Sequence, residues 1–117
     1  CKIYGGEPEN VDDAFRSLKF GRIETNETTD TIADGLKTQL GDINFPIIRN
    51  GIEEIVLVTE DQILSALKLI WSRLKIVIEP SSAVAFAALI NKSADLKSKD
   101  IGVILAGGNF KLDNITF

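Results

Sequence analysis

A short run of purely apolar residues, followed at once by a helix start signal, most constrains the fold of this chain. Residues 55–58 read Ile-Val-Leu-Val, which is typical of a strand buried on both faces, and such strands belong to parallel sheets. Thr59 and Gln62 then have the spacing of a capping box, and the two residues between them are acidic. A buried strand that runs directly into a helix indicates an α/β domain.

The same alternation of strand and helix patterns continues on both sides of this run. A helix is predicted from Thr59 to Lys75, because apolar residues recur there at helical spacing and basic residues follow them. Residues 83–90 are apolar throughout, which predicts a helix buried all round, with Ser81 or Ser82 as its cap. The other expected elements are a strand at 2–6, a short helix capped by Asn10 or Asp12 and ended by Gly21, a helical turn at 45–48 and a buried strand at 101–105.

The composition excludes several kinds of catalytic and metal sites. The chain has no histidine and one cysteine among 117 residues. It therefore lacks a Ser-His-Asp or Cys-His group, a HExxH zinc site, a cysteine zinc cluster and an internal disulfide. A net charge of −4 argues against nucleic acid or an anionic membrane as the main partner. Any chemistry must use carboxylates, lysine, hydroxyls, backbone amides or a cofactor.

The start of the sequence and its apolar runs bear on origin and location. No methionine is present and the chain opens on an apolar run, so we expect a fragment of a longer protein. Residues 1–10 lack the charged and apolar regions of a signal peptide. The longest nearly uncharged run, residues 80–91, is shorter than the ~20 residues that a membrane span needs. We expect a cytoplasmic protein without a membrane segment.

The first candidate site is the acidic segment that follows the first predicted strand, since ligands of parallel α/β sheets bind outside the carboxyl ends of strands. It contains Glu7, Glu9, Asp12 and Asp13. Hard cations such as Mg²⁺ bind carboxylate and carbonyl oxygens, so Glu7, Asp13 and a carbonyl such as that of Val11 could hold one. The alternative is a solvated helix N-terminus whose acids complement the helix dipole.

Glycines and one acid mark three further candidate positions. Residues 106–109 read Ala-Gly-Gly-Asn, and two residues without a Cβ let the backbone approach a flat ligand closely; the alternative is a plain turn after a strand. Glu79 lies between an apolar run and the predicted buried helix, where it serves either a site or the helix cap. Asp34-Gly35 is an acid–glycine pair in an apolar setting, and such pairs are commonly turns.

Six motifs follow one another along the chain: Gly6-Glu7-Pro8, Asp12-Asp13, Thr31-Ile32-Ala33-Asp34-Gly35, Phe45-Pro46-Ile47-Ile48, Ile78-Glu79-Pro80-Ser81-Ser82 and Ala106-Gly107-Gly108-Asn109. This series resembles the C-terminal part of the pyridoxal-phosphate-dependent serine racemases and serine/threonine dehydratases. No single motif is decisive, but the series extends over nearly the whole chain, in the family's order and with similar gaps. The resemblance implies an α/β fold with a parallel sheet, similar to the tryptophan synthase β subunit. Residues 1–117 would form the C-terminal part of its large catalytic domain.

The resemblance also implies roles for individual residues. In serine racemases a divalent cation such as Mg²⁺ is held by the residues that match Glu7 and Asp13 and by the carbonyl that matches Val11. The residues that match Gly35 and Glu79 lie near the cofactor ring, and the Gly-Gly-Asn tail borders its pyridine. The cofactor-binding set implied for pyridoxal phosphate is therefore Gly35, Glu79, Ala106, Gly107, Gly108 and Asn109. The family's enzymes are homodimers that act on small hydroxy amino acids.

Two departures from the family pattern limit what this chain can do. The family has serine or threonine before the Gly-Gly-Asn, where its hydroxyl meets the pyridine nitrogen, whereas this sequence has Ala106. A partner of the ring nitrogen tunes the cofactor as an electron sink, so its loss matters for activity. None of the nine lysines lies in the family's Ser-x-Lys-x-Arg setting for the Schiff-base lysine, and no glycine-rich phosphate loop is present.

We therefore expect part of a serine/threonine dehydratase or serine racemase, with no catalytic residue in this chain and the upstream half of the same enzyme as its partner. The parent reaction removes the α-proton of the amino acid. It then either eliminates water, which gives a keto acid and ammonia, or returns the proton, which gives the racemate. Two alternatives remain open: a non-catalytic α/β module that binds a partner or a small anion, and a remnant that binds a divalent cation.

Overall fold

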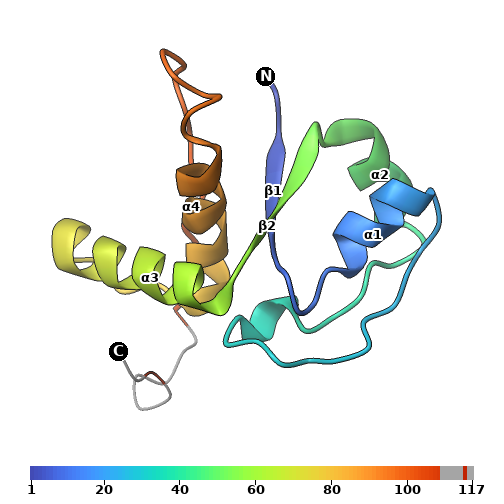
Figure 1. Ribbon diagram of the computed structural model, residues 1–117, viewed down its shortest axis with the longest axis horizontal. Helices are drawn as coiled ribbons and strands as arrows, with labels where there is room; N and C mark the ends of the chain where they lie inside the picture. Colours follow the sequence, from blue (N-terminus) through green and yellow to red (C-terminus); the bar gives the residue numbers. More distant parts are fainter. Residues whose placement is uncertain (109–114, 116–117) are drawn as a thin grey trace.

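A two-stranded parallel sheet lies at the centre of the molecule (Figure 1). This computed structural model describes residues 1–108 and residue 115. Strand β1 spans Tyr4–Pro8 and strand β2 spans Glu54–Val58. The strands pair in register from Tyr4 opposite Glu54 to Pro8 opposite Val58. Parallel pairing confirms the predicted α/β class with a parallel sheet.

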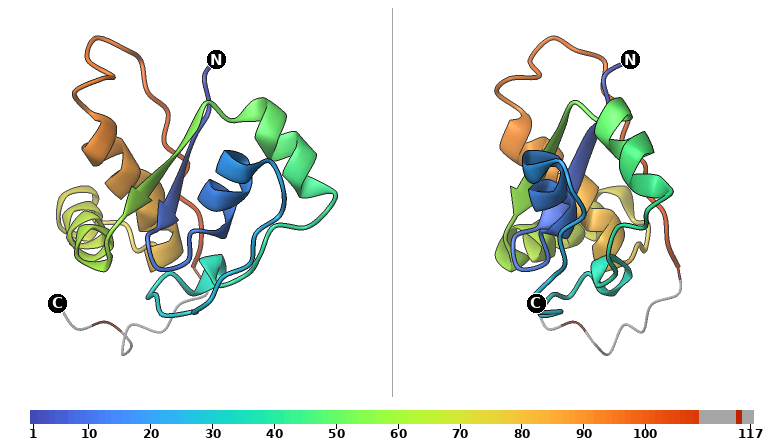
Figure 2. Two further views of the ribbon diagram at one scale, coloured as in Figure 1. Left: turned by 45° about the vertical axis from the view of Figure 1, so that its right-hand side comes forward. Right: turned by 90° about the vertical axis from the view of Figure 1, so that its right-hand side faces the viewer.

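Helices cover both sides of the sheet (Figure 2). Helix α1 (Asp13–Phe20) and helix α2 (Asn44–Gly51) lie on one side, and helix α4 (Pro80–Lys92) packs against β1 and β2 on the other. Helix α3 (Glu60–Leu74) packs on α4, outside the sheet. A short 3₁₀ helix, η1 (Asp34–Leu36), contacts α4 near the carboxyl ends of the strands.

The core lies mainly between α3, α4 and the sheet. Its buried residues include Ile63, Leu67 and Ile70 of α3 and Val84 of α4. Small residues bring α4 close to β1: a Cβ built on Gly6 would lie 2.8 Å from the Val84 carbonyl oxygen. The helix can therefore lie directly on the strand only because position 6 has no side chain.

The helix signals in the sequence were mostly confirmed. Thr59 accepts a hydrogen bond from the Gln62 amide through Oγ1 (3.2 Å), and the Thr59 amide donates to Gln62 Oε1 (2.9 Å), so the capping box that starts α3 is complete. Gly21 ends α1 in the left-handed conformation, with a φ of 71°. The predicted helical turn at 45–48 belongs to α2.

The buried strand predicted at residues 101–105 is wrong. In the described part of the chain only β1 and β2 form strands, and Ile104 is 84% exposed. Apolar composition predicts that a segment prefers burial, but a strand also needs a neighbouring strand for its N–H and C=O groups. Neither β1 nor β2 pairs with this segment, so it runs as an extended tail.

Three local predictions also need correction. Neither Ser81 nor Ser82 caps α4; Glu79 occupies the N-cap without a side-chain bond, and Pro80 supplies the first helical position. This start needs little capping, because proline has no N–H at that position. Helix α4 is not buried all round, since Ile90 is 46% exposed on the face turned away from the sheet and α3. Two of the four residues at 55–58 are only partly buried, as expected for a sheet of two strands.

Among the residues described, no helix combines the length and apolar character that spanning a membrane requires.

Candidate functional site

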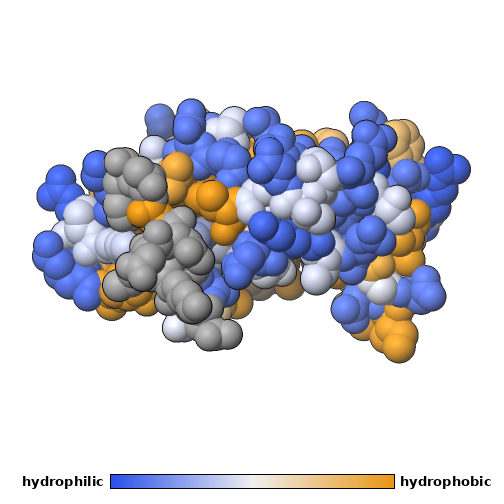
Figure 3. Space-filling model, turned by 90° about the horizontal axis from the view of Figure 1, so that it is seen from below, coloured by the Kyte–Doolittle hydropathy of each residue, from blue (hydrophilic) through white to orange (hydrophobic). Residues whose placement is uncertain are grey.

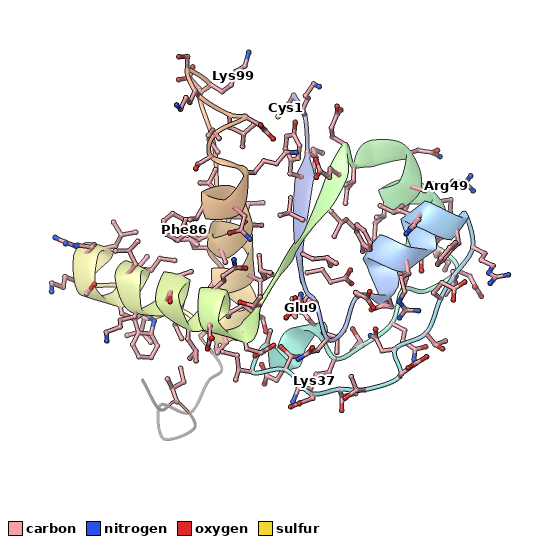
Figure 4. All side chains as sticks on the ribbon, in the orientation of Figure 1. Cys1, Glu9, Lys37, Arg49, Phe86 and Lys99 are labelled. Carbon is pink, nitrogen blue, oxygen red and sulfur yellow. The ribbon has the colours of Figure 1, made fainter. Side chains whose placement is uncertain are left out.

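The carboxyl ends of β1 and β2 meet η1 and the first turn of α4 at the lower edge of the molecule in Figure 1. Glu9, just after β1, and Lys37, just after η1, mark this edge in Figure 4. Figure 3 looks onto the same edge and shows a largely hydrophilic surface with separate hydrophobic patches. The edge is the position at which ligands of parallel α/β sheets bind.

The loop that carries Gly35 is fastened to the first turn of α4. The Gly35 amide donates to Ser81 Oγ (2.9 Å) and to Asp34 Oδ1 (3.0 Å). A Cβ at Gly35 would lie 2.9 Å from Ser81 Oγ, so glycine is required for this close approach. The sequence predicted Gly35 as a site residue, and the structure places it beside the helix that follows Glu79.

Glu79 and Gly107 lie against each other at the same edge. Gly107 has a φ of +91°, and a Cβ there would overlap the carboxyl group of Glu79. The Glu79 side chain is partly buried and makes no hydrogen bond or ion pair to any described residue. The structure thus brings together Gly35, Glu79 and Gly107, which are far apart in the sequence.

The tail that contains Ala106 is held by a hydroxyl of α4. The Ala106 amide donates to Ser82 Oγ at 2.7 Å, and Ser82 is only 9% exposed. Gly108 has open space around it, and Asn109 lies outside the described residues. Sequence reasoning treated Ser81 and Ser82 as caps, and their position directly after Glu79-Pro80 was the signal that it left unused.

Glu60, at the start of α3, also supports the loop that carries Gly35. Its Oε2 accepts a hydrogen bond from the Ile32 amide at 2.9 Å. Its Oε1 is buried and has no partner in the structure described. Sequence reasoning read Glu60 only as a favourable charge in the first turn of α3, because its contact with Ile32 joins residues that are 28 positions apart.

Glu7, in the acidic segment, is buried and is tied to the start of α1. It lies on β1 and is 7% exposed, and its carboxylate oxygens accept from the amides of Ala14 (3.0 Å) and Phe15 (2.8 Å). Burial is the largest cause of a rise in the pKa of Glu7 from 4.5 to about 7. The two amide donors lower this pKa, and the charges of Asp13 and Asp12 raise it.

Asp13 is the second buried acid of this segment. Its Oδ1 accepts from the Asn26 side chain (2.8 Å) and its Oδ2 accepts from the Leu40 amide (3.0 Å). Asp12 pairs instead with Arg16, at 2.7 Å, on the outer surface of α1. Glu7 and Asp13 also line a cavity of about 290 Å³ between α1, α2 and the sheet.

The donor chemistry of Glu7 and Asp13 fits a hard cation. Each carboxylate oxygen has a second lone pair beyond the N–H bond that it accepts. Within residues 1–108 and 115, no group of three or more His, Cys, Asp and Glu side chains could hold a metal ion. A cation here would therefore need a main-chain carbonyl such as that of Val11, which is fully buried.

The edge around Gly35, Glu79 and Gly107 fits one side of a flat ring. Two of the three residues have no Cβ, so the backbone itself forms the surface that a planar ligand can approach. The two positions are held by hydrogen bonds from Ser81 and Ser82 to the adjoining main chain.

Comparisons with known proteins agree with this geometry. Residues 1–107 match the family model described as pyridoxal-phosphate dependent enzyme. The chain is 44% identical to a serine racemase from Dictyostelium discoideum over 98% of its own length, and 40% identical to a β-hydroxyaspartate dehydratase from Paracoccus denitrificans over 97%. It superposes on the crystal structure of a bacterial-strain threonine deaminase, labelled T.th., with a TM-score of 0.88 and 40% identity, covering 95% of this chain and 41% of that one. The chain spans only 37% and 36% of the two curated relatives.

Proposed function

Because this chain belongs to the family of pyridoxal-phosphate-dependent enzymes, we propose that it is part of a serine racemase or a serine/threonine dehydratase. The proposed substrates are small hydroxy amino acids, and the products are the opposite enantiomer or a keto acid with ammonia. The observation that carries the proposal is the convergence of Gly35, Glu79 and Gly107 at the carboxyl edge of a parallel sheet. Family membership confirms the resemblance found in the sequence.

The residues of this chain would bind and orient one side of the cofactor. When bound, pyridoxal phosphate supplies the electron sink for loss of the α-proton. Gly35 and Gly107 offer main chain to the flat ring, and the Glu79 carboxylate is available as a hydrogen-bond acceptor beside it. Ala106, Gly108 and Asn109 complete the proposed cofactor-binding set, and the upstream half of the enzyme provides the lysine.

The test uses the complete enzyme whose reading frame contains this chain. It is purified with pyridoxal phosphate and supplied with L-serine, L-threonine and threo-3-hydroxyaspartate. We expect release of a keto acid or formation of the D-enantiomer from at least one of them, measured by coupled reduction of the keto acid and by chiral chromatography. An enzyme that binds the cofactor and converts none of these substrates would contradict the proposed reaction.

The isolated chain provides a second test. We expect no covalent complex when it is mixed with pyridoxal phosphate and reduced with borohydride, because none of its nine lysines has the family's setting. The readout is intact mass. A stoichiometric adduct on one lysine would show that the chain carries its own cofactor lysine.

We also propose that Glu7, Asp13 and the Val11 carbonyl hold a divalent cation, with Mg²⁺ as the first candidate. The support is a pair of carboxylates that are 7% and 3% exposed and lie on one cavity wall. We expect Mg²⁺ to raise the melting temperature of the chain and Glu7→Gln to abolish that increase. The matched control is Glu9→Gln, an exposed acid next to the same strand; an equal response of both variants to Mg²⁺ would assign the effect to general ionic stabilisation.

Assembly as a homodimer and location in the cytoplasm belong to the same proposal, and the family resemblance is their only support. Sedimentation of the complete enzyme would test the first, and fractionation of cells that express it would test the second.

A further inference from the structure

One hydroxyl at the candidate site has an unused donor. Ser82 is more than nine-tenths buried, and its Oγ accepts the hydrogen bond from the Ala106 amide at 2.7 Å. A serine hydroxyl has one donor proton in addition to its two acceptor lone pairs. No acceptor for that proton is found among residues 1–108 and 115.

The neighbouring hydroxyl is already engaged on both sides. Ser81 Oγ accepts from the Gly35 amide (2.9 Å) and lies 3.5 Å from Asp34 Oδ1, to which it donates. Glu79 offers only acceptor oxygens when it is ionised. Of the side chains that adjoin Gly35, Ala106 and Gly107 in the described structure, Ser82 is therefore the one with a donor to spare.

A donor is the chemistry that the ring nitrogen of pyridoxal phosphate needs from the protein. When it is not protonated, this nitrogen is an acceptor, and a hydrogen bond to it is one of the means by which a protein tunes the cofactor. Ala106 cannot supply the bond from its side chain. Its amide instead points at Ser82 Oγ, which places that hydroxyl at the main chain of position 106.

We propose that Ser82 supplies the hydroxyl that hydrogen-bonds to the ring nitrogen of bound pyridoxal phosphate, in place of a side chain at position 106. The inference rests on the proposed function, because it takes the cofactor to lie at the edge formed by Gly35 and Gly107. The bond from the Ala106 amide strengthens the donor, since a hydroxyl that accepts one hydrogen bond becomes more polarised and donates a better one. Ser82 thus links the tail to the ring.

The test compares variants of the complete enzyme, with cofactor binding and absorption as the readouts. Ser82→Ala is expected to weaken binding of pyridoxal phosphate to the apoenzyme about tenfold, as follows from loss of one hydrogen bond in a buried site. It is also expected to shift the absorption maximum of the bound cofactor. Ala106→Ser in the Ser82→Ala background should restore both affinity, to within about twofold, and the absorption maximum.

The matched control is Ser65→Ala, because Ser65 is an exposed serine on α3 without a partner in the described residues. It should leave cofactor affinity and absorption unchanged. If Ser82→Ala does not fold, Ser82→Cys, which has nearly the same volume and is a much weaker donor, is read in the same way.

The outcomes separate this inference from the proposed function. If Ser82→Ala lowers the melting temperature of the apoenzyme but leaves cofactor affinity and absorption unchanged, Ser82 only holds the tail and the inference is wrong. Failure of Ala106→Ser to restore the double variant would also overturn it. If the unmodified enzyme does not bind pyridoxal phosphate at all, the proposed function fails first.

Discussion

The contact between β1 and α4 leads to a sharp prediction for Gly6→Ala. The added Cβ would lie 2.8 Å from the Val84 carbonyl oxygen, 2.9 Å from the Ala88 Cβ and 3.1 Å from Val84 Cγ1. Ordinary carbon–carbon contacts are about 3.5–4.0 Å, so the helix must move by roughly half an ångström or more. The carbonyl is main chain in the middle of α4 and cannot rotate away. Overpacking of this kind costs about 1–3 kcal/mol, which lowers the melting temperature of a chain of this length by about 4–12 °C.

The assay is denaturant unfolding of the purified chain, followed by circular dichroism, with thermal melts in parallel. The matched control is Gly51→Ala, because a Cβ at the end of α2 meets nothing within 4 Å. This control should be neutral or stabilising by up to about 1 kcal/mol, since alanine restricts the unfolded chain more than glycine does. If Gly6→Ala unfolds at the same denaturant concentration as the unmodified chain, the close approach of α4 to β1 is refuted.

Three further predictions concern single contacts. Thr59→Ala removes the capping box of α3 and should lower the free energy of unfolding by about 1 kcal/mol in the same assay, while Ser65→Ala on the exposed face of α3 should change it by less than about 0.5 kcal/mol; equal losses would contradict the role of the cap. The pKa of Glu7, raised to about 7 from 4.5, means that the folded chain binds more protons than the unfolded chain between these values. Without added divalent cations, stability should therefore be greatest below pH 4.5 with respect to this group and should fall by up to about 3 kcal/mol as the pH rises through 7. Glu7→Gln should flatten this part of a pH series of unfolding free energies, and an unchanged slope would contradict it. Lys92→Ala breaks the exposed ion pair with Glu54 (2.5 Å) and should cost less than about 1 kcal/mol; a loss of several kcal/mol would contradict the expected solvent screening.

Local sequence signals predicted the elements whose stabilising contacts are themselves local. The capping box of Thr59 and Gln62, the C-terminal Gly21 and the apolar run at 55–58 each specify an element through neighbours in the sequence, and each was confirmed in the structure. The first strand was predicted at 2–6 and lies at Tyr4–Pro8, because its ends are set by pairing with β2 and not by its own residues.

Features that depend on distant contacts could not be predicted in the same way. The run at 101–105 has the composition of a strand but pairs with neither β1 nor β2. Helix α1 has Asp12 at its N-cap without a side-chain bond, and Glu7 on a strand binds the first amides instead. At the candidate site, Gly35 and Glu79 were predicted from the motif series, whereas the roles of Ser81 and Ser82 emerged only from their contacts with distant main chain.

The pairing of β1 with β2 has a consequence for the order of folding. Each pair in the register joins residues that are 50 positions apart, from Tyr4 with Glu54 to Pro8 with Val58. Closing such a loop costs conformational entropy before any sheet hydrogen bond forms, whereas α3 and α4 are separated only by residues 75–79. The helical pair should therefore assemble early and the sheet late, and amides of β1 and β2 should gain protection in pulse-labelled hydrogen exchange after those of α3.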